Sequence, residues 1–162
     1  RLAAIMDISG YKEKILPLNG RLYRYALMML KDHGEAQDAV QEVCLKLWKI
    51  KDTLENYQNI ESFAIKVTKN WCLDRIKLKK PVYVNSYTLL SPGDHANDPY
   101  KRLENEDQLK FLFRIMDKLP DQQRDIIQLR EIENLEFEEI AEILEMNINA
   151  VRVNLSRAKK KC

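Results

Sequence analysis

The chain contains few residues that would force a helix to stop. Only four of its 162 residues are glycine, and its five prolines stand at positions 17, 81, 92, 99 and 120. Proline lacks a backbone N–H and clashes with the preceding helical turn, so helices are expected to begin or end at these positions. The long stretch between Pro17 and Pro81 is free of proline and has room for several helices in succession.

Apolar side chains recur at helical spacing in this stretch and again further along the chain. The four stripes are Leu22, Tyr25, Ala26, Met29 and Leu30; Ala36, Val40, Val43 and Leu47; Phe63, Val67, Trp71 and Ile76; and Leu109, Leu112, Phe113 and Met116. The first three predict amphipathic helices that form one bundle, and the fourth predicts a second helical set beginning near Glu106. Strand-like alternation is confined to a short run, Val82 to Val84, so we expect an all-α fold.

A change of composition separates the two helical sets. From residue 81 to residue 105 the periodicity stops, and Asn, Ser, Asp, Gly and Pro accumulate. A connection of this length is unusual inside one compact domain, so it predicts a flexible linker between two small domains, residues 5–80 and 106–162. The net charge differs along the chain, with +5 for residues 1–80, −1 for residues 81–118 and −2 for residues 119–162.

Several function classes are disfavoured by the composition. No apolar run is long enough to span a bilayer and the first residues lack the apolar core of a signal peptide, so we expect a cytoplasmic protein. Cys44, Cys72 and Cys162 lie far apart, with neither histidine at ligand spacing, which argues against a metal site. Cys44 and Cys72 are expected to be small buried hydrophobes. Without a nucleophile and base pair or a glycine-rich phosphate loop, we expect no enzyme, no cofactor and no small-molecule substrate.

The last part of the chain combines a change of charge with the pattern of a helix-turn-helix. Residues 119–145 carry two basic and nine acidic side chains, whereas residues 146–162 carry five basic side chains and no acidic one. A first helix is predicted within Leu135 to Leu144, where Ile140, Ala141 and Leu144 share a face and the small Ala141 allows a neighbouring helix to approach closely. This arrangement makes DNA the expected partner.

Capping residues set the expected boundaries of these helices. Pro120 ends the preceding helix, and Asp121 can cap the next one. After a turn at residues 145–147, Asn147 is expected to cap a second helix by accepting a hydrogen bond from the backbone N–H of Ala150. That helix should run from Ile148 to about Lys160. Its expected inward-facing residues are Ile148, Val151 and Leu155.

The outward face of this second helix is suited to the major groove. Arginine can donate two hydrogen bonds to guanine, asparagine can read adenine, serine adapts, and valine can meet a thymine methyl group. Cationic side chains near the helix end are better placed against phosphates, which add affinity rather than sequence choice. The predicted base-reading residues are Asn149, Arg152, Val153 and Ser156, and the predicted phosphate contacts are Arg157, Lys159, Lys160 and Lys161. A solvated basic helix end that only complements the helix dipole is the alternative.

Two surfaces of the first domain are also candidates. Asp38, Gln41 and Glu42 are expected to project outward from their helix, although on spacing alone such a row is usually solvated surface. The helix from Ser62 to Lys80 is strongly basic, with Asp74 as its one acidic residue. A second basic surface in a chain that already has a basic recognition helix calls for a functional explanation.

The motifs of the two halves are similar, in order, to those of one protein family. The first set comprises Leu22-Tyr23-Arg24-Tyr25-Ala26, Asp38-x-x-Gln41-Glu42-x-x-x-x-Leu47-Trp48 and Phe63-x-x-x-Val67-x-x-Asn70-Trp71-Cys72-Leu73-Asp74-Arg75. The second set comprises Leu119-Pro120, Glu138-Glu139-Ile140-Ala141 and Val151-Arg152-x-x-Leu155-x-Arg157-Ala158. Over nearly the whole chain they resemble regions 2 and 4 of the extracytoplasmic-function (ECF) sigma factors, which are promoter-specificity subunits of bacterial RNA polymerase in the sigma-70 family.

The resemblance implies a role for each surface. The helix with Asp38, Gln41 and Glu42 would dock on the clamp helices of the polymerase's large subunit. The basic helix, with the loop from Asp52 to Glu61, would engage the −10 element and capture an unstacked base, by stacking and cationic contacts. The residues implied for the −10 element are Tyr57, Lys66, Lys69, Asn70, Asp74 and Arg75. The second domain would read the −35 element as duplex.

The resemblance also implies the partners and leaves one alternative. The partners would be core RNA polymerase, promoter DNA and an anti-sigma factor, and DNA would be opened without ATP. The chain departs from the family at Glu145, where glycine is frequent, so this residue is expected to carry a positive φ at a cost of about 1 kcal/mol. The alternative is a conventional helix-turn-helix repressor or activator that acts as a dimer on palindromic half-sites.

Overall fold

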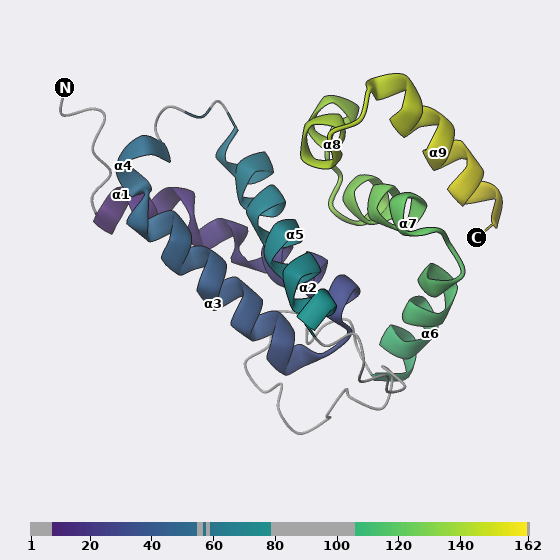
Figure 1. Ribbon diagram of the computed structural model, residues 1–162, viewed down its shortest axis with the longest axis horizontal. Coiled ribbons are helices and arrows are strands. Elements are labelled where there is room, and N and C mark those ends of the chain that lie inside the picture. Colours follow the sequence, from purple (N-terminus) through teal and green to yellow (C-terminus); the bar gives the residue numbers. More distant parts are fainter. Residues whose placement is uncertain (1–7, 55–56, 58, 79–105, 162) are drawn as a thin grey trace. The chain divides into compact units, whose positions relative to one another are not determined.

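The computed structural model describes residues 8–54, 57, 59–78 and 106–161, which Figure 1 draws as coloured ribbon. These residues form helices joined by short turns, and no strand occurs among them, which confirms the all-α prediction. The chain divides into two compact units, Arg1–His95 and Ala96–Cys162. The predicted linker, residues 81–105, and the short run from Val82 to Val84 lie outside the described residues.

The first unit is a bundle built on three long helices. Its elements are α1 (Ile8–Lys14), the 3₁₀ turn η2 (Leu16–Leu18), α2 (Asn19–Leu30), α3 (His33–Lys49), α4 (Lys51–Leu54) and α5 (Ile60–Leu78). Helices α2, α3 and α5 each pack against the other two, as Figure 1 shows for the purple, blue and teal ribbons. The bundle predicted from the first three stripes is therefore present, although α1 and η2 were not predicted.

Local backbone chemistry explains the sharp corner between α2 and α3. Lys31 ends α2 in the left-handed region, with φ of 58°, and its N–H donates to the carbonyl of Leu27 at 2.7 Å. Asp32 then caps α3, because its Oδ1 accepts a hydrogen bond from the backbone N–H of Glu35 at 3.0 Å. The corner fixes the direction of α3 and so the direction of its exposed acidic row.

Helix α2 is buried on more sides than its predicted stripe implies. Tyr23, Leu27 and Met28 are buried, whereas Met29 and Leu30, which were predicted to face inward, are half-buried. The reason is that α3 and α5 cover α2 from two directions. On α3 the difference is smaller: Ala36, Ala39, Val43 and Leu47 form the buried stripe, and the predicted Val40 is half-buried.

The predicted inward stripe of α5 is wrong. Phe63, Val67 and Trp71 are half-buried, and Ile76 is 41% exposed. The fully buried residues of the helix are mostly small: Ser62, Ala64, Ile65, Thr68 and Cys72. Small side chains let α5 approach α2 and α3 closely, so the large apolar residues lie at the edge of the contact.

The second unit contains the predicted helix-turn-helix. Its elements are α6 (Glu106–Asp117), α7 (Asp121–Ile127), the π-helical turn η5 (Gln128–Ile132), α8 (Phe137–Leu144) and α9 (Ile148–Lys161). The predicted stripe of α6 is largely confirmed, since Leu109, Phe113 and Met116 are buried and Leu112 is half-buried. Helix α9 packs against both α7 and α8.

Two features of α7 were not foreseen in the sequence. Pro120, rather than Asp121, occupies the N-cap position, and Asp121 lies in the first turn, where it accepts a hydrogen bond from Arg124 at 2.6 Å. Proline suits this site because its fixed φ is compatible with a helix start and its missing N–H would have no helical partner. At the other end, the N–H of Glu133 donates to the carbonyl of Gln128 at 3.1 Å, which closes the π turn.

Candidate nucleic-acid interfaces

The turn between α8 and α9 has the predicted geometry. Glu145 lies in the left-handed region with φ of 57°, and the N–H of Met146 donates to the carbonyl of Ala141 at 3.0 Å. Asn147 caps α9, because its Oδ1 accepts the N–H of Ala150 at 2.8 Å. A non-glycine residue with positive φ is strained, so the contacts of the helix pair must hold this turn in place.

The faces of α9 are mostly those that the sequence predicts. Val151 and Leu155 are buried, Ile148 is half-buried, and Ala158 adds a fourth inward residue. The exposed residues include every predicted DNA contact on this helix: Asn149, Arg152, Val153, Ser156, Arg157, Lys159, Lys160 and Lys161. The structure therefore gathers these side chains on the outward face of a single helix.

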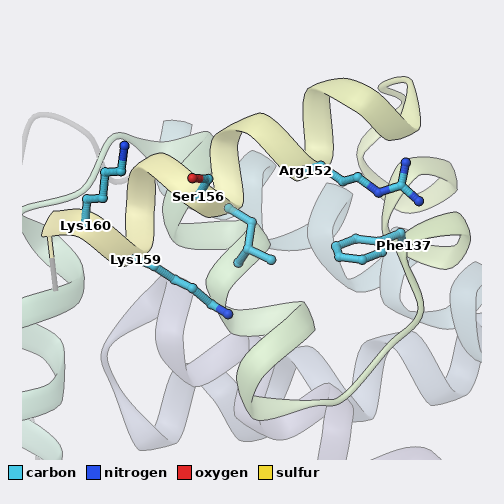
Figure 2. Close-up of a pocket in the computed structure, with 6 residues that line it drawn as sticks. Phe137, Arg152, Ser156, Lys159 and Lys160 are labelled. Carbon is cyan, nitrogen blue, oxygen red and sulfur yellow. The ribbon is translucent and has the colours of Figure 1, made fainter.

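A hollow of about 400 Å³ lies along α9 at this face. It is lined by Phe137, Arg152, Leu155, Ser156, Lys159 and Lys160 (Figure 2). Phe137 is the first residue of α8, and in Figure 2 the side chain of Arg152 extends over its ring. Phe137 was not among the residues predicted from the sequence, because an aromatic residue at a helix start carries no pattern that distinguishes it from the core.

Two arginines meet at the ring of Phe137. The guanidinium carbon of Arg130 lies 4.4 Å from the ring centroid and that of Arg152 lies 5.2 Å from it, distances within the range of cation–π attraction. Lys159 is held differently, since its Nζ lies 3.0 Å from a carboxylate oxygen of Glu131. Among the described residues, no carboxylate pairs with Arg152 or Arg157, so both guanidinium groups remain available to an anionic partner.

The predicted row on α3 is exposed along its whole length. Asp38, Gln41 and Glu42 are exposed, and they lie on the face opposite the buried stripe of the helix. Leu45, one turn further on, is 54% exposed. Leu45 thus extends the exposed row by one apolar side chain, which the periodicity of the sequence did not single out.

The residues predicted on α5 occupy different environments. Asn70 and Asp74 are exposed, whereas Lys66 and Lys69 are half-buried. Arg75 is paired with α3: its Nε donates to the Glu35 carboxylate at 2.8 Å, and its guanidinium carbon lies 5.5 Å from the centroid of the Trp71 ring. The hydrogen bond to Glu35 raises the pKa of Arg75 above the ordinary value of an arginine. Arg75 is thus held by a carboxylate, whereas Arg152 contacts an aromatic ring.

Tyr57, in the loop before α5, forms an aromatic pair with Phe63 on α5, and a hollow adjoins this loop. The rings of Tyr57 and Phe63 stack with centroids 4.3 Å apart and an angle of 14° between their planes. The adjoining hollow, of about 420 Å³, is lined by Lys14, Leu18, Leu54, Tyr57, Asn59, Ile60 and Glu61. Asn59 anchors the loop, because its Oδ1 accepts the backbone N–H of Ser62 at 3.0 Å. Tyr57 itself is 42% exposed.

Residues 8–54, 57, 59–78 and 106–161 lack two other types of site. No group of three or more metal-ligating side chains occurs in these ranges. No helix in them is long and apolar enough to cross a membrane. Cys72 is buried as predicted and Cys44 is half-buried, whereas Cys162 and His95 lie outside the described residues.

Comparison with known proteins relates both units to one family. Residues 17–81 match the family model of sigma-70 region 2, and residues 112–162 match that of sigma-70, region 4. The RNA polymerase sigma factor SigV of Bacillus subtilis is 33% identical over 141 residues, which cover 85% of this chain and 80% of SigV. The ECF RNA polymerase sigma factor SigW of the same organism is 29% identical, and the match covers 98% of this chain and 84% of SigW.

Solved structures agree with this assignment at the level of the fold. The sigma factor RpoE from Bartonella quintana, solved with the anti-sigma factor NepR, superposes with a TM-score of 0.74 at 20% identity. That match covers 95% of this chain and 94% of RpoE. The chain therefore belongs to the ECF sigma factors of the sigma-70 family, the subunits that direct RNA polymerase to specific promoters for the initiation of transcription.

Proposed function

We propose that three surfaces of this sigma factor divide the work of promoter recognition. The exposed row on α3 binds core polymerase, α5 and its preceding loop bind the −10 element, and α9 binds the −35 element. The boundaries that accompany this proposal are region 2 at residues 5–80, a linker at residues 81–105 and region 4 at residues 106–162. The observation that carries the proposal is the outward face of α9, which is exposed, basic and without an acidic residue.

The chemistry of α9 supports duplex binding with sequence choice. Arg152 and Asn149 can each make paired hydrogen bonds to a base edge in the major groove, and Val153 offers an apolar contact. Val153 is 46% exposed, so its methyl groups are accessible to a base edge. Arg157, Lys159 and Lys160 would contact phosphates, with Lys159 exchanging its pairing with Glu131 for one with DNA.

The surroundings of Tyr57 support capture of a single strand. An exposed ring beside a hollow of this size offers a stacking surface and room for a displaced base. Lys66 and Lys69 on α5 would supply cations for the strand, with the exposed Asn70 and Asp74 beside it. Arg75 is a weaker candidate than the sequence suggested, because Glu35 already holds it.

The polar row on α3 supports binding of core polymerase. Asp38 and Glu42 offer carboxylates and Gln41 an amide, and the exposed Leu45 adds an apolar anchor. An interface built on such residues gains specificity from charge and affinity from the apolar contact. We further propose that the protein acts in the cytoplasm without catalytic activity of its own. An anti-sigma factor is a further proposed partner, because the sigma factor RpoE, which has the same fold, was solved with the anti-sigma factor NepR.

The division of labour is tested by separating the two binding activities. In the Glu42→Gln variant, affinity for core polymerase should fall while binding of isolated −35 duplex is unchanged. In the Arg152→Ala variant, duplex binding should fall while affinity for core polymerase is unchanged. The matched control is Glu13→Gln, which neutralises an exposed carboxylate on α1 that is not part of the α3 row. Loss of core binding in the control, or the opposite pattern in the two variants, would overturn the assignment.

A further inference from the structure

The ring of Phe137 lies beside the arginine that we assign to base reading. It belongs to the first turn of α8, whereas Arg152 lies on α9 and Arg130 on η5. Resting on the proposed role of α9, we propose that Phe137 is a positioning residue, which holds the guanidinium of Arg152 toward one base pair of the −35 element. The ring would thereby increase specificity without touching DNA.

The ring is itself held in place. Arg130 donates from Nη1 to the carbonyl of Leu135 at 2.8 Å, and the same nitrogen lies 3.8 Å from a carboxylate oxygen of Glu136. A fixed cation therefore lies at the ring, 4.4 Å from its centroid. The N–H of Glu136 also donates to the Glu139 carboxylate at 2.9 Å, which fixes the start of α8. Phe137 thus offers a stable surface rather than a mobile one.

Arg152 depends on such a surface for a fixed direction. It is exposed, and no carboxylate among the described residues holds it. An exposed arginine loses considerable side-chain entropy when it adopts a single conformation. The ring reduces that loss before DNA arrives, because the guanidinium lies 5.2 Å from its centroid in the free protein. An interaction with a ring uses the planar face of a guanidinium and leaves its edge donors for a guanine.

Arg157 provides the contrast on the same helix. It is also exposed and without a carboxylate partner, but over residues 8–54, 57, 59–78 and 106–161 no aromatic ring lies beneath it. A phosphate contact tolerates several conformations of a side chain, whereas a bidentate base contact does not. The ring lies under the arginine whose proposed role requires a fixed direction.

The test is a double-mutant cycle on duplex DNA. The probes are duplexes that carry the upstream element of a promoter from which core polymerase initiates when the wild-type protein is present. Each probe has one base pair replaced. Phe137→Leu removes the ring but keeps apolar volume, Phe137→Tyr restores a ring, and Phe137→Met serves if the leucine variant does not fold. Phe111→Leu is the control, because it removes the ring under Arg114, 5.8 Å away, in the same unit.

The expected result is a loss confined to one position of the element. Phe137→Leu should weaken binding about two- to fivefold and reduce discrimination at the base pair affected by Arg152→Ala. It should have no further effect in the Arg152→Ala background, Phe137→Tyr should restore discrimination, and the control should change nothing. An equal loss with and without Arg152, or a loss uniform over all base pairs, would overturn the positioning role. If Arg152→Ala itself leaves the duplex profile unchanged, the proposed base-reading role fails and Phe137 has nothing to position.

Discussion

Helices α5 and α9 are both basic and both predicted to meet DNA, yet the sequence describes one far better than the other. On α9 the predicted faces are present, and every predicted contact is exposed. On α5 the predicted inward stripe of Phe63, Val67 and Trp71 lies at the edge of the contact instead. The difference comes from packing. On α9 the buried residues, Val151, Leu155 and Ala158, lie on the apolar stripe of the helix. On α5 the buried residues are mostly small, and the large apolar residues lie at the edge of the contact.

The two helices also differ in how their arginines are held. Arg75 on α5 is paired with Glu35, a residue 40 positions earlier on α3. Arg152 on α9 meets only the ring of Phe137 and keeps its donors free of carboxylate partners among the described residues. The same residue type is thus part of the fold in one helix and available to a ligand in the other. Spacing in the sequence cannot separate these cases, because the partner of Arg75 is distant along the chain.

The largest expected effect tests which face of α5 is buried. Ile65→Ala should lower the free energy of unfolding of the first unit by about 2–5 kcal/mol, because Ile65 is fully buried. Val67→Ala should cost about 1 kcal/mol or less, because Val67 is half-buried. Both tryptophans lie in the first unit, so urea unfolding followed by tryptophan fluorescence reports on it. Equal losses for the two variants would contradict the buried face seen in the structure and support the stripe predicted from the sequence.

The next effect separates base reading from phosphate binding on α9. Arg152→Ala should cost about 1–3 kcal/mol at a single base pair of the −35 duplex. Arg157→Ala should weaken binding of all duplexes alike and lower the slope of log affinity against log salt by about 1. Binding isotherms at several salt concentrations measure both quantities. A uniform loss for Arg152→Ala would reassign that residue to a phosphate.

A smaller effect concerns the ion pair that distinguishes Arg75. Glu35→Gln should slightly strengthen binding of a single-stranded −10 oligonucleotide, because it releases a partly exposed arginine from a surface ion pair. In an Arg75→Gln background the same change should have no effect. Fluorescence anisotropy with a labelled oligonucleotide measures all four proteins of this cycle. A gain that is equal in both backgrounds would show that the pairing does not limit Arg75.

A last prediction concerns Cys72, which lies in the buried stripe of α5. Burial raises the pKa of its thiol to about 12, so little reactive thiolate forms at pH 8. Cys72 should therefore react with a thiol reagent roughly tenfold or more slowly than Cys44, as read by mass spectrometry of peptides. The pKa of Cys72 is higher in the folded than in the unfolded protein, so the unfolded protein loses the thiol proton first as pH rises. The free energy of unfolding therefore has its full contribution from this group below about pH 9 and loses it as pH rises toward 12. Rapid labelling of Cys72 in the folded protein would contradict its burial.

Much of the architecture could be predicted, because it depends on local patterns. Proline and glycine positions indicated long helices, and the cap at Asn147 follows from neighbouring backbone groups. The positive φ at Glu145 was expected from the family resemblance instead. The exposure of Asp38, Gln41 and Glu42 also followed from helical periodicity. Residues a few positions apart are enough to determine features of this kind.

The features that the sequence did not reveal depend on contacts between distant segments. The meeting of Arg130, Phe137 and Arg152 requires η5, α8 and α9 to be in place. The choice of Pro120 over Asp121 as the N-cap depends on the backbone angles at that corner. The inward face of α5 depends on having two neighbours rather than one. In each case the local pattern was compatible with more than one arrangement.

The most direct test of the whole account is run-off transcription with bacterial core polymerase on genomic promoter fragments from the host, with and without this protein. The account predicts specific transcripts that require the protein and are weakened by Arg152→Ala and by Glu42→Gln. Reproducible DNA binding without any core-dependent initiation would contradict it, and would favour an ordinary helix-turn-helix repressor or activator.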